Sequence, residues 1–189
     1  MNRASLRFAP PKKWLDPNRN HFFFGFAHLL STLSQRGIRG KALEIGSFGG
    51  ESASMIGMSG LFDEIHCIEP FDGEPPLDTE WWRVHSDFNM NTRYYPVKLH
   101  IGYSYDIIPT LEEKFDFIYI DAEHDYENVK QDIQLSLPLL KPHGVIAGHD
   151  YQPEHPGVMM AVHEILGKPH KRFEDDSWLY FASRLGTEK

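Results

Sequence analysis

The chain has 189 residues, of which 41% are hydrophobic and 13% aromatic, and its formal net charge is −8. This length and composition predict one globular domain with a full hydrophobic core and exclude a disordered chain. With 19 Lys and Arg against 27 Asp and Glu, the charge balance argues against nucleic acid as a partner, because phosphate contacts need clustered positive charge.

The cellular context follows from what the sequence lacks. A single cysteine, Cys67, rules out an internal disulfide and favours a reducing compartment, and its apolar surroundings predict a packed core residue. The N-terminal stretch has no hydrophobic segment of the secretory type, and no apolar run reaches the length of about 18 residues that a membrane span needs. We therefore expect a cytoplasmic protein without a membrane partner.

The first half of the chain predicts a helix followed by alternating strands and helices. A proline-containing, irregular lead-in covers 1–20, and apolar residues at helical spacing then predict a helix over 21–37. Short apolar runs predict buried strands, and the amphipathic segments between them predict helices. The expected strands are 41–46, 64–71 and 97–104, the expected helices are 52–58 and 79–91, and a loop is expected over 72–79.

The second half continues this alternation and ends in two short strands. The expected helices are 106–114, 124–140 and 157–166, and the expected strands are 115–122, 144–151, 171–175 and 178–184. The last two strands suit an antiparallel hairpin across an Asp-Ser pair. The order predicts an α/β fold: a Rossmann-like, doubly wound, mostly parallel sheet of about seven strands with a C-terminal antiparallel hairpin. Ligands bind such sheets at the carboxyl ends of the strands.

The first predicted strand ends in an acid and a glycine-rich turn, in the stretch LEIGSFGGESA. Glu44 closes the strand, and Gly46, Gly49 and Gly50 would let the backbone approach a ligand closely. The dinucleotide fingerprint G-x-G-x-x-G is not matched, because Phe48 stands where its second glycine belongs and would obstruct a pyrophosphate. A smaller ligand with one carboxylate remains compatible, and a turn without any ligand is the alternative.

The next two strand ends suggest contacts to a nucleoside. Glu69 lies about 20 residues beyond the glycine turn, where an acid can accept hydrogen bonds from both ribose hydroxyls. In IGYSYD, Gly102 followed by Ser104 suits an adenine edge, and Tyr103 or Tyr105 would line the ring. A solvated loop acid and a plain strand-to-helix cap are the alternatives at these two strand ends.

The fourth and fifth predicted strands both end in an aspartate. Asp121 and Asp150 are therefore expected at the same edge of the sheet, where two carboxylates repel unless positive charge lies between them. Oxygen ligands favour Mg, Mn or Ca, and His124 or His149 would shift the preference toward Mn, Fe or Zn. The alternative is that Asp121 only caps the following helix.

Together these motifs resemble those of class I S-adenosylmethionine-dependent methyltransferases, over about 41–166. The nearest subgroup is the small-molecule, often metal-dependent O-methyltransferases, which include catechol O-methyltransferase and the macrocin O-methyltransferase type. LEIGSFGGESA resembles the first motif of this group, and GYSYDIIPTL resembles the adenine-side segment of the catechol enzyme. FIYIDAEHDYENVKQDI with LLKPHGVIAGHDY resembles the macrocin type.

The resemblance implies S-adenosylmethionine and a divalent cation, Mg or Mn, as cofactors, and it gives each matching position a role. Glu44 and Gly46 would hold the methionine end of the cofactor, Glu69 the ribose and Ser104 the adenine. The implied cofactor-binding set is Glu44, Gly46, Ser47, Phe48, Gly50, Ser52, Glu69, Pro70, Gly102, Tyr103, Ser104 and Asp121. The implied metal ligands are Asp121, His149 and Asp150.

Two residues compete for the role of base. His124 stands where the catechol enzyme has a lysine, and Glu123 stands where macrocin-type enzymes have an acid. We prefer His124, because an imidazole with a pKa near ~6.5 can accept a proton at neutral pH. The implied catalytic set is thus His124, Glu123 and Asp121. Ala122 and His143 replace glycines that are common in the group, which puts the local loop geometry in doubt.

The expected reaction is methyl transfer to an oxygen of a small-molecule acceptor, which the sequence does not identify. The aromatic segment 72–93 would form a lid over the acceptor or simply pack, and the aromatic N-terminal segment would support a homodimer. A nicotinamide-dependent oxidoreductase and a catalytically silent cofactor-binding protein are the alternatives.

Overall fold

The computed structural model describes residues 21–73 and 79–184, with side chains from 24 to 183 in these ranges. The predicted lead-in over 1–20 and part of the predicted loop over 72–79 lie outside the described residues. The strands are β1 (Gly40–Ile45), β2 (Phe62–Glu69), β3 (Val97–Ile101), β4 (Phe115–Ile120), β5 (Leu140–Gly148), β6 (Lys171–Arg172) and β7 (Trp178–Phe181). The helices are α1 (His21–Gln35), α2 (Glu51–Met58), α3 (Trp81–Thr92), α4 (Ser104–Ile107), α5 (Tyr126–Ser136) and α6 (Pro156–Leu166).

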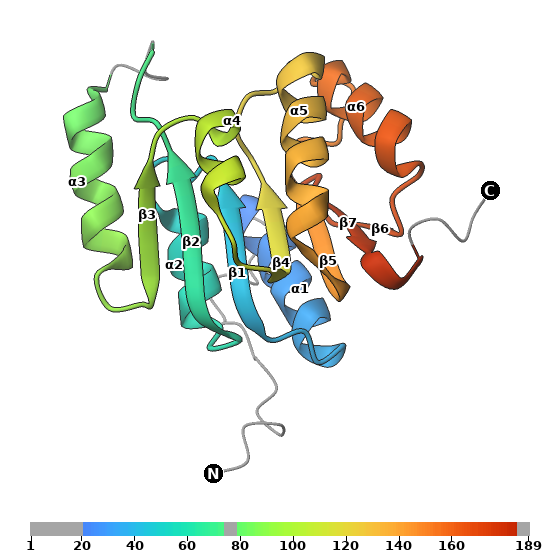
Figure 1. The fold of residues 1–189 in the computed structure, drawn as a ribbon, viewed down its shortest axis with the longest axis horizontal. Coiled ribbons are helices and arrows are strands. Elements are labelled where there is room, and N and C mark those ends of the chain that lie inside the picture. The colour runs from blue at the N-terminus through green and yellow to red at the C-terminus, as the bar shows by residue number, and fades with distance from the viewer. Residues whose placement is uncertain (1–20, 74–78, 185–189) are drawn as a thin grey trace.

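The strands form one seven-stranded sheet in the order β3-β2-β1-β4-β5-β7-β6. Strands β1 to β5 pair in parallel, whereas β7 runs antiparallel to both β5 and β6. In Figure 1, α4 and α5 lie in front of the sheet and α1 and α2 behind it. The doubly wound, mostly parallel fold with an antiparallel C-terminal hairpin is therefore confirmed.

The sheet reverses its winding direction at β1. The chain proceeds outward from β1 through β2 to β3 and then crosses back to β4 on the other side of β1. Ile45 at the end of β1 is level with Ile68 of β2 and Ile120 of β4. The segments that follow these strands therefore emerge beside one another, at the switch point where ligands bind this class of sheet.

Each face of the sheet has its own hydrophobic core. One core joins α1, α2 and α3 to the sheet and contains Cys67, which is fully buried as predicted. The other core joins α5 and α6 to the opposite face. In the first core, Phe26 of α1 packs edge-on against Tyr119 of β4, with ring centroids 4.7 Å apart.

The structure corrects the predicted boundaries around β3 and β5. The strand predicted over 97–104 ends at Ile101, and α4 begins at Ser104, before the predicted helix over 106–114. The helix predicted to reach 140 ends at Ser136, because a 3₁₀ turn containing Pro138 follows and β5 already begins at Leu140. The strand begins before Pro142, because this proline lies in a bulge of β5, where it need not donate a hydrogen bond. The bulge is visible in the pairing with β4: Phe115 pairs with Leu140, but Phe117 pairs with Val145.

The C-terminal hairpin and the predicted lid also differ in detail from expectation. The strand predicted over 178–184 ends at Phe181, and residues 173–177 connect β6 to β7, rather than an Asp-Ser pair alone. Within 72–93, α3 is the crossover helix between β2 and β3, and its Val84 and Phe88 are buried. A lid role for this segment stays a prediction. Among the described residues, none of the helices has the length and apolarity to cross a membrane.

Truncation of Phe26 tests whether α1 is integral to the domain. Because Phe26 is fully buried, we expect Phe26→Ala to lower the free energy of unfolding by about 3–5 kcal/mol. Tyr94→Ala serves as the control, because Tyr94 is 80% exposed, and its change should stay within about 0.5 kcal/mol. Urea denaturation measures both. Equal effects of the two substitutions would mean that α1 packs only loosely.

Candidate functional site

The glycine turn after β1 sits directly on the end of β4. Gly46 has a φ of +82°, and a Cβ at this position would lie 2.1 Å from the carbonyl oxygen of Asp121. The backbone N–H of Gly46 donates to Ile68, and the N–H of Asp121 donates to Ile45. Only glycine fits both the close approach and the left-handed backbone, so the turn brings the ends of β1 and β4 into contact.

The strand that leads into this turn carries a buried carboxylate whose hydrogen-bonding capacity the fold does not fully use. Glu44 is fully buried, and its Oε2 accepts a hydrogen bond from the Cys67 thiol at 3.5 Å. Its Oε1 and the nearby Ser47 Oγ, both buried, have no hydrogen-bond partner among the described residues. Burial raises the pKa of Glu44 to about 7, and the nearby hydroxyls of Ser52 and Ser47, which do not reach hydrogen-bond geometry with it, offset only part of this shift. Unsatisfied buried polar atoms are rare and costly, so these two oxygens call for a partner such as water, an ion or a ligand.

A cavity of about 440 Å³ opens beside the turn. It brings together seven of the predicted site residues, from α2 and from the segments that follow β1, β4 and β5. The lining residues are Gly46, Ser47, Phe48, Glu51, Ser52, Asp121, Ala122, His124 and Asp150. Glu51, in the first turn of α2, was not predicted, although its position directly after the glycines could have indicated it. Glu123 and His149 do not line this cavity, but together with His124 they line a second, much smaller one beside it.

Glu69 fixes the conformation of the glycine turn. Its Oε2 accepts a hydrogen bond from the backbone N–H of Phe48 at 2.8 Å, and its Oε1 accepts one from the N–H of Phe71 at 3.1 Å. Both phenylalanines have positive φ, 40° and 50°, a strained conformation for residues with a Cβ. Glu69 therefore lies against the glycine turn, next to Pro70. Ribose binding by this carboxylate stays a prediction.

The predicted adenine contacts lie apart from the cavity. The Ser104 hydroxyl donates to Oδ1 of Asp132 on α5, and burial raises the pKa of this aspartate to about 6. Sequence analysis missed Asp132, because its position within a polar stretch of the helix gave no sign of burial. Gly102 precedes Tyr103, whose hydroxyl donates to Asp72 at 3.3 Å and whose ring stacks on Tyr105. Adenine binding by this segment stays a prediction.

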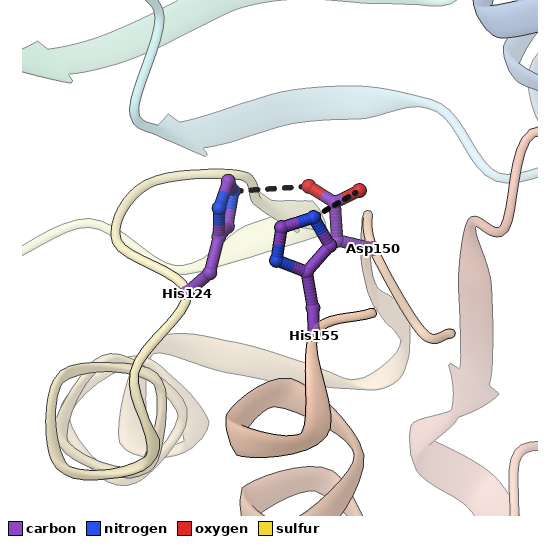
Figure 2. A group of neighbouring side chains, drawn as sticks. All are labelled: His124, Asp150 and His155. Atoms are coloured by element: carbon purple, nitrogen blue, oxygen red, sulfur yellow. Dashed lines mark ion pairs between the residues drawn. The ribbon is translucent and has the colours of Figure 1, made fainter. Parts of the chain in front are cut away.

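Asp150 is the centre of a cluster of charged side chains. His149 Nδ1 lies 3.2 Å from Oδ2 of Asp150 and 3.7 Å from Oδ1 of Asp121, so the three predicted metal ligands are neighbours. His124 Nε2 lies 2.9 Å from Asp150 Oδ2, and His155 Nε2 lies 3.7 Å from Asp150 Oδ1. Figure 2 shows His124, on the loop after β4, next to His155, at the start of α6, each joined by a dashed line to the Asp150 carboxylate. The backbone of Asp150 is left-handed, with φ 57°.

The charges of this cluster balance one another. Burial lowers the pKa of His149, but hydrogen bonding to Asp150 and the charge of Asp121 outweigh it and raise the value to about 9. Burial opposes ionisation of Asp150, yet His124 and His149 hold its pKa well below the usual range. The hydrogen bond that His124 donates to Asp150 raises the pKa of His124. Histidines thus supply the positive charge that two adjacent carboxylates require.

Sequence analysis also missed His155. This residue precedes Pro156 and Gly157 outside any recognisable motif, and its position depends on how α6 packs. A Cβ at Gly157 would lie 2.5 Å from the backbone oxygen of His124. The start of α6 therefore packs directly on the loop after β4, and the rings of His124 and His155 come within 4.5 Å, centroid to centroid.

Comparison with known proteins identifies the family of this chain. A family model described as a methyltransferase domain matches residues 43–151. An uncharacterized protein of Acanthamoeba polyphaga mimivirus is 27% identical over 131 residues, which cover 66% of this chain and 58% of the relative. The chain thus spans less than two thirds of the length of the curated relative that it matches.

Two solved structures share the fold. The O-methyltransferase NovP superposes with a TM-score of 0.67 at 16% identity, covering 96% of this chain and 89% of that one. The O-methyltransferase TomG from Streptomyces achromogenes, solved in complex with SAM, superposes with a TM-score of 0.57 at 20% identity, covering 80% of this chain and 76% of that one. At such identities the likeness shows the fold alone.

The buried carboxylate predicts an unusual pH dependence of stability. Above pH 4.5 the Glu44 carboxyl ionises in the unfolded chain but not in the folded one, so the folded state loses stability until the pH reaches its raised pKa of about 7. This loss amounts to about 3 kcal/mol. We expect Glu44→Gln to stabilise the ligand-free protein, by an amount that grows from pH 5 to about pH 7 and then levels off.

Urea denaturation at a series of pH values measures this difference. Glu112→Gln, at an exposed position, is the matched control and should show little change at any pH. A stability difference between the Glu44 variant and the parent that stays constant from pH 5 to pH 8 would contradict the prediction.

Proposed function

The chain belongs to the methyltransferase domain family, and we propose that it transfers a methyl group from S-adenosylmethionine to an oxygen atom of a small molecule. The observation that carries this proposal is the pair of unsatisfied buried oxygens, Glu44 Oε1 and Ser47 Oγ, beside a cavity of about 440 Å³ at the switch point of the sheet. A fold keeps such atoms unpaired where a polar ligand will satisfy them.

The residues around the cavity fit the parts of S-adenosylmethionine. The buried carboxylate of Glu44 suits the cationic methionine end of the cofactor, since a positive ligand favours the ionised carboxylate that burial disfavours. Glu69 retains lone pairs for the ribose hydroxyls after accepting its two backbone hydrogen bonds, because an ionised carboxylate has about four acceptor sites. Phe48, which argues against a pyrophosphate at the turn, also lines the cavity.

His124 is the proposed proton acceptor. It lines the cavity together with Asp121 and Asp150, whereas the exposed Glu123 does not. In its neutral form His124 donates its Nε2–H to Asp150, and the Nδ1 lone pair can then take the proton of an acceptor hydroxyl. The hydroxyl oxygen then forms a bond to the methyl carbon as the bond from that carbon to the sulfonium sulfur breaks. S-adenosylmethionine supplies the activated methyl group, and the chain supplies alignment and proton transfer.

Asp121, His149 and Asp150 are the residues that would hold a divalent cation. Their ligand atoms lie within 4.8 Å of one another. Their donor set of two carboxylates and one imidazole suits Mn²⁺ better than Mg²⁺, because Mg²⁺ prefers oxygen ligands only. A bound cation would lower the pKa of an acceptor hydroxyl. His149 must give up its proton before Nδ1 can serve as a ligand.

NovP and TomG are O-methyltransferases, which supports oxygen as the accepting atom. The family match favours methyl transfer over the nicotinamide-dependent alternative, and a silent cofactor-binding protein remains an outcome of the tests below. A homodimer, a cytoplasmic location and a small-molecule acceptor stay predictions.

Calorimetry with S-adenosylhomocysteine and with NADH tests the cofactor. We expect binding of the sulfur cofactor only. Replacing the buried acid by Glu44→Gln should weaken that binding at least about tenfold, or about 1.4 kcal/mol, because the amide carries no charge to pair with the methionine ammonium. Glu112→Gln should bind like the parent. Tight NADH binding without a response to S-adenosylhomocysteine would refute the proposal.

A screen with methyl-labelled S-adenosylmethionine and small hydroxylated molecules identifies the acceptor and then tests the cation. With an acceptor in hand, EDTA should abolish transfer and added Mn²⁺ or Mg²⁺ should restore it. Asp121→Asn should need a higher cation concentration for the same rate. Transfer that is indifferent to EDTA would limit Asp121 and Asp150 to roles in structure and proton transfer.

A further inference from the structure

We propose that His124, Asp150 and His155 form a second cation seat, which selects nitrogen-binding cations such as Zn²⁺, Co²⁺ or Ni²⁺ over Mg²⁺. The seat shares Asp150 with the proposed site of Asp121 and His149 but adds His124 and His155 in place of those two residues. It needs neither S-adenosylmethionine nor an acceptor, so it stands independently of the proposed reaction.

The geometry of the three side chains suits a metal ion. Their ligand atoms lie within 4.8 Å of one another. The separations from the Asp150 oxygens are 2.9 Å to His124 Nε2 and 3.7 Å to His155 Nε2. Ligands bound at about 2.0–2.2 Å around one ion lie about 3 to 3.5 Å apart. Small side-chain adjustments would therefore let one ion bind all three residues.

The composition of the seat decides which cation it takes. Two imidazoles and one carboxylate favour Zn²⁺, Co²⁺ or Ni²⁺, whereas Mg²⁺ prefers six oxygen ligands in a near-octahedral arrangement. The exposed fractions of the His124 and His155 side chains are 42% and 32%, so a cation can reach the seat from solvent. The remaining coordination positions would face the cavity that His124 and Asp150 line.

The backbone holds the two histidines in place. Gly157 lets the start of α6 pack on the loop that carries His124, because any Cβ there would collide with backbone atoms. His155 occupies the N-cap position of α6, one residue before its first turn. Asp150 presents its carboxylate between them from a left-handed backbone. Two rigidly placed elements thus define the seat.

Occupation of this seat would regulate the proposed reaction. A cation on Nε2 of His124 leaves the ring proton on Nδ1, so the imidazole has no lone pair left to accept a proton. The cation would also take Asp150 from the neighbouring site. This consequence, unlike binding itself, rests on the proposed function: Zn²⁺-type cations would inhibit where Mn²⁺ or Mg²⁺ activates.

Cobalt binding to the metal-free, tag-free protein tests the seat, because the visible absorption of Co²⁺ reports its ligands. We expect Co²⁺ to bind and Mg²⁺ to compete poorly. His155→Gln and His124→Gln should each weaken Co²⁺ binding at least about tenfold and change its absorption spectrum. Asp121→Asn should weaken Co²⁺ binding less than either histidine substitution, since Asp121 is not a ligand of the seat and acts on His124 only through its charge.

His143→Gln is the matched control, because His143 is an exposed histidine in the bulge of β5. Circular dichroism of each variant, and S-adenosylhomocysteine binding by the three histidine variants, establish that the fold and the cofactor site are intact, so a failure of the seat is distinguishable from a failure of the proposed function. Unchanged Co²⁺ affinity in His155→Gln would overturn the proposal. A loss of Co²⁺ binding in Asp121→Asn as large as in His155→Gln would also overturn it in favour of a single site.

Discussion

The contact between the ends of β1 and β4 is the constraint on which the site depends. Gly46 and Asp121 meet there so closely that no side chain fits at Gly46. This contact places the glycine turn, the buried Glu44 and the carboxylates that follow β4 and β5 around one cavity. The parallel sheet creates the crevice, because its winding direction reverses at β1. The glycine determines how narrow the crevice is.

The site contains buried carboxylates that lower the stability of the fold. Glu44 keeps an unpaired oxygen in a fully buried position, and Asp121 and Asp150 meet across His149. Buried carboxylates of this kind destabilise a fold unless a ligand or a cation compensates them. These carboxylates gather at one edge of the sheet, where Asp150 also has a left-handed backbone. The two cores on the faces of the sheet are hydrophobic instead.

The histidines around Asp150 add imidazole nitrogens to the carboxylates of this methyltransferase-family domain. Asp150 lies within reach of three imidazoles, of His124, His149 and His155. A carboxylate in that position can orient a base, bind an oxygen-preferring cation with Asp121, or bind a nitrogen-preferring cation with His155. These uses compete for one carboxylate, because His124 and His149 share its Oδ2, so metal identity and proton transfer are physically linked in this site.

The sequence by itself determined the elements that a pattern of adjacent residues specifies. Apolar runs and helical spacing predicted the alternation of strands and helices, and the rule that ligands bind at the carboxyl ends of parallel strands brought Glu44, Glu69, Asp121 and Asp150 to one edge. The early start of β5 escaped prediction, because a bulge in a strand depends on the register of its partner β4.

Only the tertiary structure decided which side chains of that edge meet. The Ser104–Asp132 hydrogen bond joins α4 to α5, and the approach of His155 to His124 depends on the packing of α6 through Gly157. These contacts link segments that are about 30 residues apart in the chain, and no local pattern encodes such a distance. The sequence therefore determined the edge at which the candidate site lies, whereas helix packing decided which histidines reach Asp150.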